Sequence, residues 1–231
     1  MYRALRKIYR MWPKTIRRVV ERLPPLRAAK NGLKKLIALA TPPQDIYDRE
    51  FYVHRQAWDL DRSAAAIAES LVRLFSPKTV LDAGCGSGEL LFHLQKSVYV
   101  LGLEVSDAAL DICRQKGLNV RKFDLGRDLL PPDEIFDLAV SLEVAEHLPP
   151  WQAKHYVRVL TTAAPIVVIS AARPGQGGEG HLNEQPPEYW ISLFESAGFR
   201  FSAEDTETLR ATWAQAGVKP WYVANVLCFR R

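Results

Sequence analysis

Residues 79–90, TVLDAGCGSGEL, are the stretch that decides the fold of this chain. A short apolar run ends in Asp82, three glycines follow at alternate positions, and a helical pattern begins at Leu90. This order predicts a strand, a tight turn and the start of a helix, because glycine allows a sharp turn and lets a ligand approach the backbone N–H groups. The dinucleotide-binding fingerprint would need a glycine at position 89, and a phosphate-binding P-loop would need a lysine, so the spacing favours neither.

Composition and length indicate one large globular domain with an appendage. The chain has 231 residues, of which 48% are hydrophobic and 25% charged, enough for an ordinary core. The net charge of +5 is unevenly distributed, since residues 1–40 hold twelve Lys or Arg and one acid. The rest of the chain then holds 31 − 12 = 19 basic and 26 − 1 = 25 acidic residues, a net charge of about −6.

The cysteines and the apolar runs exclude several classes. Cys85, Cys113 and Cys228 are odd in number and lack metal-ligand spacing, so we expect free thiols in a reducing compartment and no metal site. No apolar run reaches the roughly 18 residues of a membrane span, and no uninterrupted apolar core marks a secretory signal. We therefore expect a cytoplasmic protein.

Residues 1–43 are predicted to be a basic amphipathic helical arm, and residues 44–231 the main domain. Leu5, Trp12 and Ile16 share one helical stripe, and basic side chains occupy the other positions. This pattern favours peripheral contact of residues 1–40 with an anionic membrane at its inner face, with docking or oligomer contact as the alternative. Nucleic acid is disfavoured, because the body is acidic and carries no RNA-binding motif.

Alternating apolar runs after the glycine loop predict an α/β fold. Glu104 follows the second strand, 20 residues after Gly84, and such a carboxylate can accept hydrogen bonds from a ribose diol. Asp124 follows the third strand, and Glu143 the fourth. We expect helices over 61–75, 90–96, 106–116 and 151–162, strands over 98–103, 120–123, 136–140, 166–170, 199–203 and 221–229, and a small cap over 206–221.

The G-x-G-x-G loop, the acids after strands two and three, and the Glu-His segment after strand four together resemble the class I S-adenosylmethionine (SAM) methyltransferases. The resemblance covers about residues 44–231 and implies a Rossmann-like, seven-stranded, mainly parallel sheet with helices on both faces and an antiparallel last strand. It implies SAM as the cofactor and an aromatic segment over 44–60 that closes over it. The cofactor-binding residues it implies are Asp82, Gly84, Cys85, Gly86, Gly88, Glu104, Val105, Asp124, Leu125, Leu142 and Glu143.

Two histidines are candidate catalytic residues. His147 follows the fourth strand, and His181 lies in a long Gly/Pro-rich loop over 173–187. A histidine can take the proton of an acceptor hydroxyl, although a structural role for His147 is equally open. The segment HLNEQPPEYW at 181–190 resembles a bacterial subgroup of these enzymes that acts on sugars.

The sequence therefore predicts O-methylation of a sugar hydroxyl, on a glycan or a lipid-linked glycan precursor. Another small-molecule acceptor, such as a quinone or polyketide, is one alternative. A non-catalytic scaffold that binds a protein partner is another. An acceptor pocket rich in aromatic side chains would favour the quinone, and one rich in hydrogen-bonding groups the sugar.

Overall fold

The computed structural model describes residues 32–33, 35–56 and 59–231 of the chain. Most of the predicted basic arm lies outside these residues. Within the predicted arm, residues 35–39 are helical, and α4 (Pro43–Ile46) spans its predicted boundary with the main domain. No helix of the described residues is long and apolar enough to cross a membrane.

A single seven-stranded sheet forms the centre of the molecule, in the order β3-β2-β1-β4-β5-β7-β6. Six strands are β1 (Thr79–Ala83), β2 (Tyr99–Glu104), β3 (Val120–Lys122), β4 (Leu138–Leu142), β5 (Ile166–Ser170) and β6 (Arg200–Phe201), and the last is β7 (Leu227–Arg230). The first five pair in parallel, and β7 pairs antiparallel with β5 and β6. The predicted Rossmann-like sheet is confirmed.

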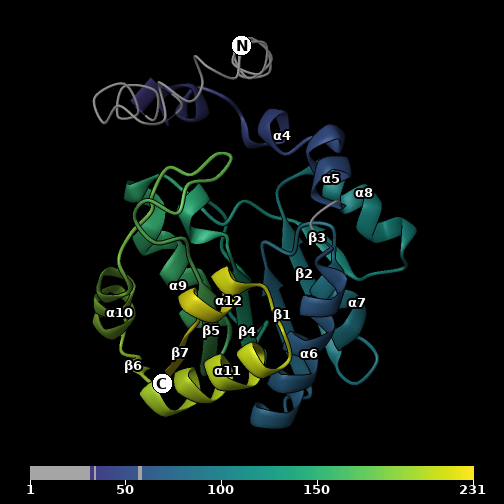
Figure 1. Ribbon diagram of the computed structural model, residues 1–231, viewed down its shortest axis with the longest axis vertical. Coiled ribbons are helices and arrows are strands. Elements are labelled where there is room, and N and C mark those ends of the chain that lie inside the picture. The colour runs from purple at the N-terminus through teal and green to yellow at the C-terminus, as the bar shows by residue number, and fades with distance from the viewer. Residues whose placement is uncertain (1–31, 34, 57–58) are drawn as a thin grey trace.

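Helices cover both faces of the sheet (Figure 1). One face carries α6 (Asp61–Phe75), α7 (Glu89–Leu94) and α11 (Ala203–Gln215), and the other carries α9 (Ala153–Ala163) and α10 (Pro187–Ser196). Alternate residues of a strand enter opposite clusters: Val167 packs with α9 and α10, and Val168 packs with α6 and α11. Burial on both faces explains why the strands read as continuous apolar runs.

The remaining described helices are short and lie between the elements already named. They are α5 (Arg49–Gln56), α8 (Asp107–Gln115), α12 (Pro220–Asn225) and two short 3₁₀ helices over Ala145–His147 and Pro150–Gln152. Ser106 caps α8 by accepting a hydrogen bond from Ala109 N, and its hydroxyl donates to the carbonyl of Tyr47 at 2.5 Å. This second bond holds the segment before α5 against the carboxyl end of β2.

Two expectations about the C-terminal region are wrong. The predicted strand over 221–229 is a strand only from Leu227, because Pro220 begins α12 and its helical residues run to Asn225. The predicted cap over 206–221 is mostly α11, a regular helix that Ser202 caps. Trp213 of α11 is fully buried and donates from Nε1 to Ser70 Oγ at 2.7 Å, so α11 is part of the core.

Candidate active site

The glycine loop between β1 and α7 has the left-handed backbone that its spacing predicts. The φ angles are +83° at Gly84, +56° at Gly86 and +79° at Gly88. A β-carbon at Gly88 would lie 2.4 Å from Cδ1 of Leu118, so packing against the body demands glycine there. A β-carbon at Gly86 would instead lie 2.9 Å from Nη1 of Arg55. The absence of a side chain at Gly86 therefore lets the Arg55 guanidinium approach the loop backbone closely.

Glu104 ties the loop to the end of β2. Its Oε2 accepts a hydrogen bond from Gly86 N at 2.9 Å, and its Oε1 accepts from Val105 N and Ser106 N at 2.8 Å each. Burial raises the pKa of the Glu104 carboxyl, although these backbone donors oppose the rise. Since a carboxylate has about four acceptor sites, about one remains for a ligand hydroxyl.

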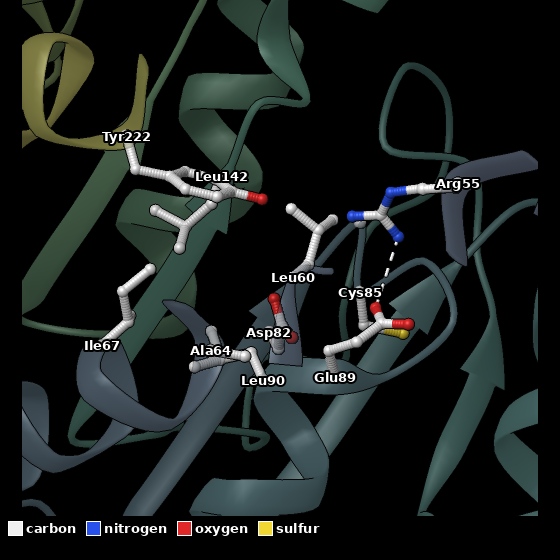
Figure 2. Close-up of a pocket in the computed structure, with 11 residues that line it drawn as sticks. Arg55, Leu60, Ala64, Ile67, Asp82, Cys85, Glu89, Leu90, Leu142 and Tyr222 are labelled. Atoms are coloured by element: carbon white, nitrogen blue, oxygen red, sulfur yellow. Dashed lines mark hydrogen bonds and ion pairs between the residues drawn. The ribbon is translucent and has the colours of Figure 1, made fainter. Parts of the chain in front are cut away.

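A pocket that is partly open to solvent lies beside the loop (Figure 2). It brings together four of the predicted cofactor residues, namely Asp82, Gly84, Cys85 and Leu142. Side chains from α5, α6, α7, α12 and the segment before α6 complete the lining: Arg55, Leu60, Ala64, Ile67, Glu89, Leu90 and Tyr222.

The charges in this pocket come from three side chains. Burial, with the neighbouring charges of Glu104 and Glu89, raises the pKa of Asp82 to about 7. Nη1 of Arg55 lies 3.3 Å from Glu89 Oε2. Burial alone would lower the pKa of Arg55, but Glu89 and Tyr222 outweigh it and the pKa is raised. Among the described residues that line the pocket, Arg55 is the single cation.

This charge pattern suits SAM, which carries an ammonium, a sulfonium and one carboxylate. The acids Asp82 and Glu89 suit the two cationic centres, and Arg55 suits the carboxylate. The residues present therefore fit SAM.

Seven of the eleven predicted cofactor residues lie outside the lining of the pocket, namely Gly86, Gly88, Glu104, Val105, Asp124, Leu125 and Glu143. Val105 contributes its N–H to Glu104. Asp124 closes its own turn, since Oδ1 accepts from Gly126 N at 2.9 Å, and it pairs with Arg127. Leu125 is buried in the core. Their contact with a cofactor stays a prediction.

His147 and His181 lie together at the carboxyl ends of β4 and β5. Their rings make an edge-to-face contact with centroids 4.9 Å apart. Tyr47 Oη hydrogen-bonds His147 Nδ1 at 2.9 Å, and His181 Nδ1 hydrogen-bonds Glu184 Oε1 at 2.9 Å. Burial, and next the charge of His181, lowers the pKa of His147 to about 3, so His147 is neutral at physiological pH and a weak base.

Glu143 connects this histidine pair to the pocket. Its backbone has φ +54°, a conformation that a non-glycine residue adopts only under strain. Its side chain accepts from Gln176 Nε2 at 2.9 Å and from Asn225 Nδ2 at 3.0 Å. Gln176 belongs to the 173–187 loop, and Asn225 to the same helix as the pocket residue Tyr222, so Glu143 ties the loop to the pocket wall.

Sequence reasoning missed Arg55 and Glu146. The sequence predicted a closing segment over 44–60 from its aromatic residues. Of these, Tyr47 hydrogen-bonds His147, and Trp58 lies outside the described residues. Arg55 lies in that same segment, but its position over the glycine loop depends on how α5 packs. Glu146 is fully buried, and both of its carboxylate oxygens are without a hydrogen-bond partner among the described residues.

Comparison with known families gives one match over the central part of the chain. The family model described as "Methyltransferase domain" matches residues 80–163. The matched span starts in β1 and ends with α9, so it includes the glycine loop, Glu104 and His147.

Curated relatives match over 35–42% of the chain. Norajmaline N-methyltransferase of Rauvolfia serpentina is 34% identical over 107 residues, which are 42% of this chain and 37% of the relative. Ubiquinone biosynthesis O-methyltransferase of Paramagnetospirillum magneticum is 36% identical over 86 residues, which are 35% of this chain and 34% of the relative. The matched region thus spans little more than a third of either relative.

Solved structures share the whole fold at low identity. The sugar N-methyltransferase KedS8 of Streptoalloteichus has a TM-score of 0.61 at 17% identity, and the match covers 79% of this chain and 92% of that one. A TehB-like SAM-dependent methyltransferase of Corynebacterium glutamicum has a TM-score of 0.58 at 21% identity, with coverage of 79% and 97%.

Proposed function

We propose that this chain, which matches the methyltransferase domain model over residues 80–163, is a class I SAM-dependent enzyme that transfers the methyl group of SAM to a sugar hydroxyl, on a glycan or a lipid-linked glycan precursor. The observation that carries the hydroxyl acceptor is the pair of histidines: Tyr47 hydrogen-bonds His147, Glu184 hydrogen-bonds His181, and the two imidazole rings meet edge to face.

SAM, when bound, supplies an electrophilic methyl group. We assign Asp82 and Glu89 to its cationic groups, Arg55 to its carboxylate and Glu104 to a ribose hydroxyl. The apolar walls of the pocket, including Leu60 and Leu142, exclude water from the reacting atoms.

The acceptor's proton goes to His181 in this proposal. The Nδ1–H of His181 donates to Glu184, which leaves the lone pair of Nε2 free to accept a proton. Glu184 in turn accepts two backbone N–H groups of its own loop, at 2.7 and 2.9 Å, so the imidazole is held in one orientation. His147 has the lower basicity and serves to orient the acceptor.

A sugar acceptor is favoured over a quinone by the polarity of this region. Tyr47 and Glu184 hydrogen-bond the histidine pair, and Gln176 and Asn225 form a second polar group with Glu143 after β4. Two solved structures of the same fold are described as sugar or amino pentose methyltransferases, which is compatible with this acceptor class. The relative from Paramagnetospirillum is named for ubiquinone biosynthesis, so the quinone remains the comparison substrate.

The test is formation of S-adenosylhomocysteine with a panel of nucleotide sugars, free glycans and a short-chain quinol. Wild-type protein should turn over at least one sugar and add one methyl group to it. His181→Ala should bind SAM normally and lose most of kcat, about 10²–10⁴-fold for a general base. Full kcat in His181→Ala would make the base assignment wrong, and turnover of the quinol alone would make the acceptor class wrong.

The lipid-linked version of the acceptor rests on residues 1–40, with twelve basic residues and one acid. We propose that they contact the anionic inner face of a membrane. Co-sedimentation of the full chain with anionic vesicles should be strong at low salt and weak in Arg17→Glu/Arg18→Glu. Equal sedimentation of the wild-type chain with neutral and anionic vesicles would contradict the proposed contact with an anionic membrane. The alternative of a non-catalytic scaffold would require SAM binding with no turnover of any acceptor.

A further inference from the structure

Glu146, His147 and His181 form a cluster that the methyl-transfer chemistry does not require as a unit. Each offers one ligand atom, and these atoms all lie within 4.8 Å of one another. Two of the residues come from the 3₁₀ helix after β4, and His181 comes from the loop after β5. From this geometry we infer that the cluster is a binding site for one divalent transition-metal ion.

The Glu146 carboxylate is the first reason. It is fully buried, and neither oxygen has a partner that meets full hydrogen-bond geometry, although the backbone N–H groups of Glu146 and Ala172 and the carboxyl of Glu143 lie close to it. His181 Nε2 lies 4.0 Å from Glu146 Oε1, too far for a hydrogen bond. A buried carboxylate with only weak donors is costly, and a cation at this position would satisfy it.

The outer partners of the two histidines are the second reason. Imidazoles that bind a metal through one nitrogen usually donate the other N–H to an oxygen, which fixes the tautomer and the ring orientation. Here Nδ1 of His181 is held by Glu184, and Nδ1 of His147 is held by Tyr47 Oη. A proton on His181 Nδ1, held by the Glu184 carboxylate, leaves the lone pair of His181 Nε2 for a metal. His147 would bind through Nε2 in the tautomer in which its Nδ1–H donates to Tyr47 Oη.

The size of the cluster and the ligand types identify the ion. Metal bonds of about 2.0–2.2 Å place two tetrahedral ligands about 3.4 Å apart, so ligand atoms up to 4.8 Å apart must move together by up to about 1.4 Å. Two imidazoles and one carboxylate suit zinc or a neighbouring first-row ion, and leave a coordination position open. Magnesium, which prefers an all-oxygen shell, fits this set poorly.

Gly178 shows how tightly the loop covers the cluster. A β-carbon at Gly178 would lie 2.0 Å from His181 Nε2, so an alanine there would push the imidazole away without removing a ligand. If the proposed methyl transfer is correct, a bound metal would replace His181 as the group that promotes loss of the hydroxyl proton, because a metal lowers the pKa of the oxygen it binds. Metal binding itself does not depend on that proposal.

The experiment is calorimetric titration of Zn²⁺ into chelator-treated full-length protein, with the visible spectrum of added Co²⁺ as a second readout. Wild type should bind one equivalent, with a low-symmetry Co²⁺ spectrum. Glu146→Gln, His181→Ala and Gly178→Ala should each abolish that site or weaken it by more than a hundredfold, and Glu184→Gln should weaken it about 10–100-fold. His155→Ala, on α9 and bonded to the Asp128 carbonyl, should bind like wild type.

SAM titration of every variant checks that the fold is intact and separates the two proposals. Metal binding that is lost in Glu146→Gln while SAM binding remains supports the site. Absence of metal binding in a wild-type protein that binds SAM overturns it, as does unchanged binding in Glu146→Gln and His181→Ala. A wild type that binds the metal but not SAM leaves the metal site standing and contradicts the proposed function.

Discussion

Replacing Arg55 by alanine should weaken SAM binding by removing the cation that suits the SAM carboxylate. Arg55 is the single cation among the described pocket-lining residues, and its guanidinium also lies 3.3 Å from Ser87 Oγ above the glycine loop. A hydrogen bond to a charged group contributes about 1.5–3 kcal/mol, so the dissociation constant should rise about 10–150-fold. The Arg55 side chain is 22% exposed, which favours the lower half of that range.

Ligand analogues make this prediction specific. Calorimetry with SAM, S-adenosylhomocysteine and decarboxylated SAM should show that Arg55→Ala weakens the first two alike, because both carry the carboxylate. Decarboxylated SAM should bind the variant and the wild type equally. Arg55→Lys should recover part of the loss, since lysine keeps the charge without the planar fork.

Arg49→Ala is the matched control, because Arg49 lies on the same helix and is exposed. It should leave all three ligands unaffected. If Arg55→Ala weakened decarboxylated SAM as much as SAM, Arg55 would act by shaping the loop through Ser87 and Glu89. The assignment of Arg55 to the carboxylate would then be refuted.

Three further predictions concern the loop, the buried acid and the proposed metal. Gly88→Ala should lower the free energy of unfolding by about 2–4 kcal/mol in urea titrations, because its β-carbon would lie 2.4 Å from Leu118 Cδ1 at φ +79°. Burial raises the pKa of Asp82 to about 7 in the folded state, so its contribution to the free energy of unfolding should fall by about 1.4 kcal/mol per pH unit as pH rises from about 4 to 7. Asp82→Asn should lack that pH dependence in urea titrations, and an equal dependence in the variant would contradict the burial of Asp82 as its cause. Removal of divalent metal with a chelator should lower kcat for the acceptor without changing SAM affinity, and Zn²⁺ should restore it in wild type but not in Gly178→Ala.

The fold was predictable because its signals are local. The glycine spacing, the apolar strands and the acids at strand ends each depend on a few consecutive residues, and together they predicted the sheet. The C-terminal error arose because Trp221–Phe229 is a short apolar run that suits a buried helix or a strand equally well. Pro220 at the first helical position and the Ser202-to-Asp205 cap were the signals for α12 and α11.

The site was predictable only where a motif carries it. Asp82, Gly84 and Cys85 line the pocket because they belong to the glycine stretch itself. Arg55 reaches the pocket through the packing of α5, a contact between segments more than 30 residues apart. The buried carboxylate of Glu146 is likewise a tertiary property, since a Glu-His pair gives no indication of how deeply each side chain lies.

Calorimetric titration of SAM into the full chain and into Glu104→Gln would show whether the site at the glycine loop binds SAM. Wild type should have one site of micromolar affinity, and Glu104→Gln should bind clearly more weakly, because its amide would replace a carboxylate that accepts three backbone N–H groups. No binding in wild type, or equal binding in a folded Glu104→Gln, would contradict binding of SAM at this site.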